Sequence, residues 1–169
     1  MSSSIVFPLH YSFYSWIAAF LDFLLLFFVY TSTQSYVMLS IIQILAVASS
    51  LAVYSFLTPR IPIVEIPRVY ALASTLLMLS VAAIAVAISY ESVALVIALI
   101  LLISPTEAII SVLFEAVLPL TFTRDSLLRV NSVVRAVRYL SPLAVLASGL
   151  AIEWLGVKGA ATSIAVLTF

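Results

Sequence analysis

The sequence predicts an all-α membrane protein, a polytopic bundle of transmembrane helices that forms one domain over 1–169. Of its 169 residues, 65% are hydrophobic and 8% are charged, with a mean hydropathy of +1.32, whereas soluble domains carry about 25% charged residues. The apolar runs also reach the length of about 20 residues that a helix needs to cross a bilayer. Because the connections between these runs are short, little chain remains for a soluble domain.

Six apolar segments follow one another along the chain. Full spans are expected at about 11–30, 37–57, 69–90, 93–118 and 129–152, and a partial sixth span at 159–169. The last segment has eleven residues and covers about 16 Å of a hydrocarbon core of about 30 Å, so we expect the chain to stop inside the membrane.

Proline and polar residues mark the connections. The stretch 58–68 holds three prolines and three charges in eleven residues, and proline disfavours regular helix. We therefore expect a loop at 58–68, a second loop at 119–128 and a turn at 153–158. Pro105 is expected to bend the fourth span.

The basic residues predict the orientation of the bundle. In a five-span topology, Lys158 is the one of seven basic residues that falls on the side opposite the N-terminus. Cytoplasmic loops carry the excess of Lys and Arg, so we expect a cytoplasmic N-terminus in a multi-pass protein of the cell (plasma) membrane. The residues of the basic side are Arg60, Arg68, Arg124, Arg129, Arg135 and Arg138, with Asp125 beside Arg124.

Composition also argues against several functions. There is no cysteine and there is one histidine, so thiolate and polyhistidine metal sites are not expected. Seven basic residues against seven acidic residues give no footprint for nucleic acid. No phosphate-binding loop or nucleophile motif is present. We therefore expect no enzyme activity, no cofactor and no metal; the expected partners are the lipid bilayer, other helices and a small-molecule solute.

Asp22 is the one charged residue of the first span. It is expected near the bilayer midplane, where an ionisable group is costly and marks a candidate solute or proton path. Two other interpretations stay open: the carboxyl caps a helix contact, or the helix lies shallower in the membrane than assumed.

The fourth and fifth spans carry the remaining charges within the membrane. Ser104, Glu107, Ser111 and Glu115 are spaced by three and four residues and so share one helix face. Asn131, Arg135, Arg138 and Pro142 share a face of the next helix. The depths allow the pairs Glu115–Arg135 and Glu107–Arg138, because buried charges need partners. Such pairs are either static bridges or a gate that opens during a conformational cycle.

The junction between the fourth and fifth spans resembles that of major facilitator superfamily exporters of the drug and siderophore type. Leu118 and Pro119 match a Leu-Pro pair, Arg124 and Asp125 match an Arg-Glu pair, and Asn131 and Arg138 match later polar positions. At the end of the first span, Tyr30, Thr33 and Ser35 resemble the family's Y-x-x-T-x-S, and Thr168 and Phe169 fall where the family has serine and phenylalanine. The family's loop motif between the second and third helices is not kept, since Thr58 and Pro62 replace its glycine and aspartate.

This resemblance implies the N-terminal six-helix half of a secondary-active, proton-coupled exporter that works by alternating access. It would place Asp22, Ser104, Glu107 and Ser111 on the solute and proton path. The cytoplasmic gate would contain Glu115, Asn131, Arg135 and Arg138. A second half would be needed, from another chain, a homodimer or a missing C-terminal region. The alternative is a non-transporting membrane subunit or relic fragment in which the same charges are static pairs.

Overall fold

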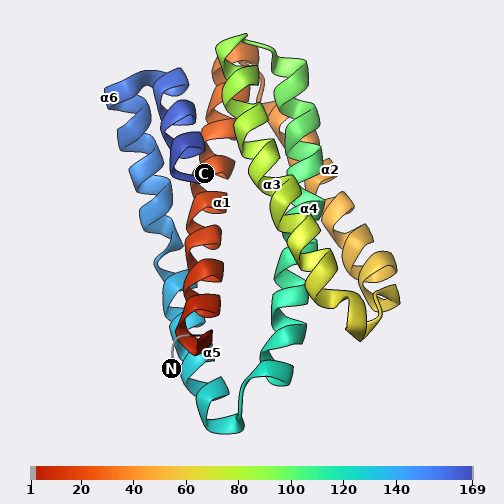
Figure 1. Ribbon diagram of the computed structural model, residues 1–169. Helices are drawn as coiled ribbons and strands as arrows, with labels where there is room; N and C mark the ends of the chain where they lie inside the picture. Colours follow the sequence, from red (N-terminus) through yellow and green to blue (C-terminus); the bar gives the residue numbers. More distant parts are fainter. Residues whose placement is uncertain (1–2, 169) are drawn as a thin grey trace.

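The computed structural model describes residues 3–168, apart from the side chains at 3–10, 12, 120, 121, 124, 125, 129, 138 and 168. Within this range the chain forms helices and no strand, which confirms the predicted all-α bundle (Figure 1). Five described stretches are long and apolar enough to cross a membrane. They are Phe13–Thr33, Tyr36–Arg60, Ile63–Ser89, Val93–Pro119 and Ser126–Leu167.

The first two helices form a tight hairpin, as the sequence predicts. Helix α1 spans Ser3–Thr33 and α2 spans Tyr36–Ala52. Gln34 adopts a left-handed conformation with φ of 51°, and its side chain donates a hydrogen bond to the carbonyl oxygen of Thr31 at 3.0 Å. Ser35 then caps α2 by accepting the Met38 amide at 3.2 Å. These local bonds satisfy helix-end groups and reverse the chain within two residues.

The predicted loop at 58–68 is largely helical. After α2 the chain forms one wider turn at Val53–Leu57 and two short tight turns at Thr58–Arg60 and Ile63–Glu65. Helix α3 then spans Ile66–Ser89. Pro67 lies in the first turn of α3, where backbone amides have no hydrogen-bond acceptor within the helix. The amide proton that proline lacks therefore costs no helical hydrogen bond, and Pro67 is compatible with the start of a helix.

Helix α4 spans Val93–Thr121 and continues through Pro105 and Pro119. It is joined to α3 by a short turn in which Glu91 has φ of 55°. Helix α5 spans Arg124–Tyr139 and follows α4 almost directly. The predicted loop at 119–128 is therefore wrong, because the polar residues after Thr123 continue as helix.

The predicted single span at 129–152 is divided into two helices. Helix α5 ends at Tyr139 and α6 spans Ser141–Thr168. Pro142 explains the break at Leu140, because proline cannot donate to the preceding turn and disfavours helical geometry in the residue before it. Within α6 the chain reverses at Gly156, whose φ of 71° and ψ of 171° suit glycine. Residues 157–168 return part of the way, as the sequence predicts for a partial sixth span (Figure 1).

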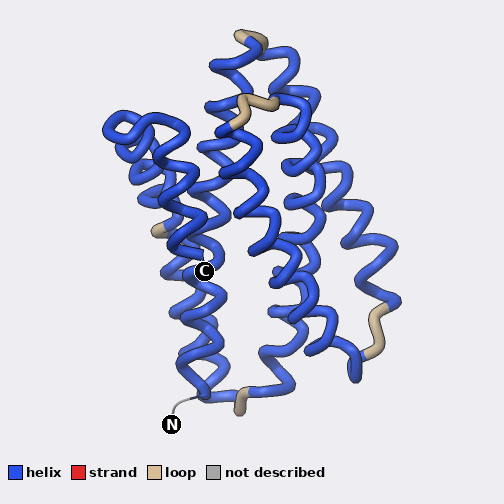
Figure 2. The backbone as a smooth tube through the Cα atoms, turned by 45° about the horizontal axis from the view of Figure 1, so that its top comes forward, coloured by secondary structure: helices blue, strands red, loops and turns tan. Residues whose placement is uncertain are grey.

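The connections gather at two ends of the bundle. In Figures 1 and 2 the N-terminal end of α1, the connection from α2 to α3 and that from α4 to α5 lie at the lower end. The turns from α1 to α2 and from α3 to α4, with the reversal in α6, lie at the upper end. This arrangement agrees with the alternation of loops from which the orientation was predicted.

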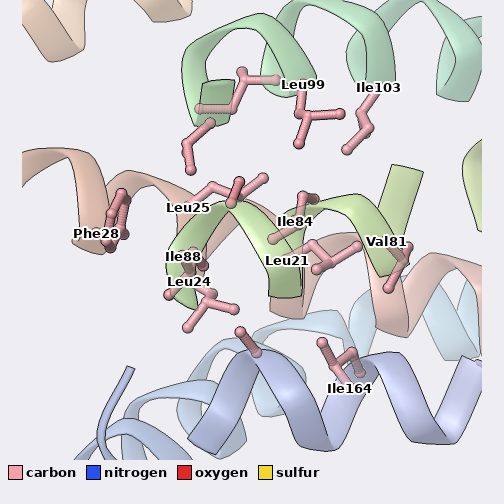
Figure 3. Packing of buried hydrophobic residues seen from close by; sticks show 14 of the residues in the cluster. Leu21, Leu24, Leu25, Phe28, Val81, Ile84, Ile88, Leu99, Ile103 and Ile164 are labelled. Carbon is pink, nitrogen blue, oxygen red and sulfur yellow. The ribbon is translucent and has the colours of Figure 1, made fainter. Parts of the chain in front are cut away.

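A large apolar core fills the upper half of the bundle and joins α1, α2, α3, α4 and the returning part of α6. Leu21, Leu25 and Ile84 lie between Ile103 of α4 and Ile164 of α6 (Figure 3). Ser148 is fully buried and donates its hydroxyl to the carbonyl oxygen of Phe20 at 3.2 Å. This bond ties α6 to α1 outside the apolar contacts.

Candidate functional site

Two adjoining cavities lie between α1, α2 and α4 beside the apolar core, since Leu25, Ala46 and Ile100 of that core line the first cavity. Their volumes are about 320 and 380 Å³. Asp22 on α1 and Glu107 on α4 line both of them, together with Ser104. Ser111 lines the second cavity. The structure therefore brings together all four residues predicted for the solute and proton path.

The two carboxyl groups sit differently in this space. The Asp22 side chain is exposed where it faces the cavities. One carboxyl oxygen of Glu107, Oε1, is buried and has no hydrogen-bond partner among the described residues. The hydroxyl of Tyr14, which lines the second cavity with Glu107, is also buried without such a partner. Buried polar atoms without partners are costly, so this part of the cavity is suited to a polar or charged ligand.

Helix α2 supplies a wall that the sequence analysis did not assign to the site. Gln43 and Ser50 of α2 line the first cavity together with Tyr54, which lies in the wider turn directly after α2, and Ser50 and Tyr54 also line the second. Their spacing of seven and four residues places them on one helix face, which is the signal that could have identified them. Ser50 also donates to the carbonyl oxygen of Ser104 at 3.1 Å and so joins α2 to α4 at the level of the cavity.

A small aromatic cluster lies between the cavities and the lower end of the bundle. Tyr11 on α1 stacks on Phe114 of α4 with ring centroids 3.7 Å apart and an interplanar angle of 10°. The Tyr11 hydroxyl lies 3.3 Å from Oγ of Ser111. Val130 and Val134 of α5 complete this buried cluster with Leu118. The cluster packs α1, α4 and α5 against one another at the end predicted to be cytoplasmic.

The residues predicted for a gate lie outside the two cavities. Glu115, Asn131 and Arg135 line a separate pocket of about 420 Å³ between α4 and α5. The face predicted for α4 is therefore divided, with Ser104, Glu107 and Ser111 at the cavities and Glu115 at this pocket. Among the side chains that the structure describes, an ion pair joins Glu91 and Lys158. Glu115 and Arg135 line the same pocket.

Several predicted residues lie outside the described side chains. The backbones of Arg124, Asp125, Arg129 and Arg138 belong to α5, but the predicted Glu107–Arg138 pair involves a side chain that is not described. Arg60 and Arg68 are described, and both are exposed near the connection from α2 to α3.

An ion pair at the upper end was not foreseen from the sequence. Lys158 Nζ donates to Glu91 Oε1 at 2.8 Å and links the turn before α4 to the reversal in α6. This hydrogen bond and the positive charge of Lys158 hold the pKa of Glu91 below its usual value. Both side chains are solvent-exposed, so the pair adds little stability.

The fold defines the class of protein: an all-α polytopic membrane bundle with two cavities that Asp22 and Glu107 line. No family model, curated protein or solved structure matches the chain.

Proposed function

We propose that the chain is half of a secondary-active exporter of small molecules and that it works by alternating access. The resemblance of its α4–α5 junction to major facilitator exporters first suggests this function. The observation that supports it most is the position of Asp22 and Glu107: they come from two different helices, lie within the apolar bundle and line the same cavities. Intramembrane carboxyls on a polar cavity are typical of solute and ion pathways.

The packing of the bundle favours a cavity that opens toward one end. A large apolar core joins the helices beside and above the cavities, whereas the cluster of Tyr11 and Phe114 below them is small. Fewer apolar contacts must separate to open the lower end than the upper end. We infer that Asp22 and Glu107 act as proton or cation sites and that the pocket of Glu115, Asn131 and Arg135 belongs to the cytoplasmic gate.

A second six-helix half is part of the proposal. The Asp22 side chain is exposed, and a carboxyl at this depth is costly against hydrocarbon. A second half from another chain, a second copy or a downstream region would cover this side and enclose the cavity. The solute would then cross the plasma membrane between the two halves, with the N-terminus of this chain in the cytoplasm.

Transport in proteoliposomes tests this function. The chain is reconstituted alone and with its candidate second half, a pH gradient is imposed, and efflux of a panel of amphipathic fluorescent solutes is followed. We expect gradient-driven efflux that Asp22→Asn and Glu107→Gln each lower by at least about tenfold, since removal of a group needed only in the rate-limiting step lowers the rate directly. Glu65→Gln is the matched control, because this exposed residue lies in the α2–α3 connection.

Unchanged efflux in both cavity variants would remove these carboxyls from the path. Absence of efflux in every preparation, with the chain correctly inserted and its partner bound, would instead favour a non-transporting membrane subunit.

A further inference from the structure

Three serine hydroxyls that line the cavities have their protons engaged by main-chain carbonyl oxygens. Ser15 and Ser104 donate their hydroxyl protons to main-chain carbonyl oxygens one turn earlier, at 3.1 and 2.9 Å, and the single proton of Ser50 is directed to the carbonyl oxygens of Ala46 and Ser104, both at 3.1 Å. All three residues line one or both cavities. Because each hydroxyl has one proton to donate, these serines face the cavity as acceptors.

The charged groups of the cavities have the same sign. Asp22 and Glu107 line both cavities, and the described lining contains no Lys, Arg or His. The main-chain amides of the surrounding helices are engaged in helical hydrogen bonds. A site with two carboxyls, acceptor hydroxyls and no basic group disfavours an anion and favours a cation.

The two orphaned polar atoms indicate where a ligand would bind. Glu107 Oε1 is buried without a hydrogen-bond partner among the described residues, and so is the hydroxyl oxygen of Tyr14. Both residues line the second cavity together with Asp22 and Ser104. A bound cation there would supply the partner that Glu107 Oε1 lacks. The unpartnered oxygen therefore indicates a ligand, which the presence of two carboxyls alone would not do.

We propose that Asp22 and Glu107 hold one monovalent metal cation of the sodium type between α1 and α4, with the Ser104 hydroxyl as a neutral oxygen ligand. Carboxylate and hydroxyl oxygens are hard donors that suit such an ion better than copper, nickel or zinc. No group of three or more His, Cys, Asp and Glu residues lies together among the described side chains. Calcium takes six to eight oxygen ligands, more than two carboxyls and one hydroxyl supply. Magnesium is bound through one or two carboxylates plus waters, so it is the divalent competitor that the titration must exclude.

This inference rests on the proposed function only for the role of the ion in transport. The proposed function assigns a proton or a cation to Asp22 and Glu107, and the inference specifies that cation as sodium. Binding itself requires no transport and no second half, so it can be measured on the purified chain.

The test uses the full chain in detergent micelles, titrated with sodium chloride against choline chloride at constant total salt. Sodium-23 NMR line broadening reports binding, and the thermal unfolding midpoint reports linkage, because a ligand of the folded state raises that midpoint. We expect saturable broadening and a rising midpoint with sodium and neither with choline. Glu107→Gln and Asp22→Asn are expected to weaken binding by at least about tenfold through loss of a charged ligand, and Ser104→Ala by less.

Glu65→Gln makes the same chemical change outside the cavities and is expected to bind sodium as the parent does. Equal responses to sodium and choline would overturn the inference, as would parental sodium binding by both Glu107→Gln and Asp22→Asn. A saturable response to magnesium or calcium in place of sodium would also overturn the monovalent assignment. Circular dichroism of each variant confirms that a lost response does not come from unfolding.

The two proposals can fail separately. Efflux that depends on both carboxyls but not on sodium would overturn the cation site and leave the exporter standing. Sodium binding that is lost in the cavity variants, in a chain and partner that move no solute, would support the cation site and overturn the exporter.

Discussion

Replacement of Phe114 by alanine tests the aromatic cluster that closes the bundle below the cavities. Phe114 is fully buried and stacks on Tyr11 at 3.7 Å. Truncation of phenylalanine to alanine leaves a cavity of about 100 Å³, which at about 24 cal/mol per Å³ costs about 2.4 kcal/mol. Loss of the stacked pair adds about 0.5–1.5 kcal/mol. The transfer contribution is small in a membrane, because lipid is as apolar as the core.

We therefore expect Phe114→Ala to lower the free energy of unfolding by about 3–4 kcal/mol, the sum of these two contributions. Unfolding in bicelles, followed by circular dichroism, measures this value. Phe13→Ala is the matched control, because the Phe13 side chain is 56% exposed and its loss should cost less than about 0.5 kcal/mol. A loss below about 1 kcal/mol for Phe114→Ala, or equal losses for both variants, would refute the cluster as a stabilising contact.

Three further perturbations follow from single contacts. Gly156→Ala should lower the free energy of unfolding by about 1–3 kcal/mol because alanine is strained in the glycine-only backbone region. Gly149→Ala is the control and should change it by less than about 0.5 kcal/mol, because its added Cβ would meet Phe23 at an ordinary contact distance of 4.0 Å. Equal free energies of unfolding for the two variants would contradict this. Ser148→Ala should cost about 0.6 kcal/mol, and at most about 1.7, through loss of its interhelical hydrogen bond, and a stabilised variant in the same unfolding assay would show that this bond contributes nothing. Lys158 lowers the pKa of Glu91, so the contribution of the pair to stability is present above the ordinary pKa of glutamate and is lost as the pH falls through the lowered value. Lys158→Met should raise the Glu91 pKa, which carbon-13 NMR measures. An unchanged pKa would exclude the ion pair in solution.

The spans and the α4 side of the cavity were predictable from the sequence. Apolar run length sets the number of helices, and the spacing of Ser104, Glu107 and Ser111 places them on one face whatever the neighbours. The break at Leu140 was within reach of the same reasoning, because Pro142 disfavours a continuous helix. Length alone instead predicts one span at 129–152.

The contacts between helices could not be predicted in this way. The Tyr11–Phe114 stack joins apolar side chains that carry no directional signal in the sequence, and many equivalent aromatic residues were available. The pairing of Glu91 with Lys158 depends on how two turns meet at the upper end. The α2 wall formed by Gln43, Ser50 and Tyr54 shows a helical spacing, but only the packing of α2 against α4 shows which way that face points.

Access of water to the cavity tests the central claim most directly. The chain contains no cysteine, so after purification from labelled membranes the signal of a single replacement has no background from the chain itself. Ser50→Cys and Ser104→Cys report the cavity that Asp22 and Glu107 line, and Leu79→Cys, at a 58% exposed apolar position on α3, reports the outer surface. The cavity predicts that a membrane-impermeant thiol reagent labels the two serine positions and leaves the Leu79 position unlabelled. Protection of both serine positions, or equal labelling of all three, would contradict it.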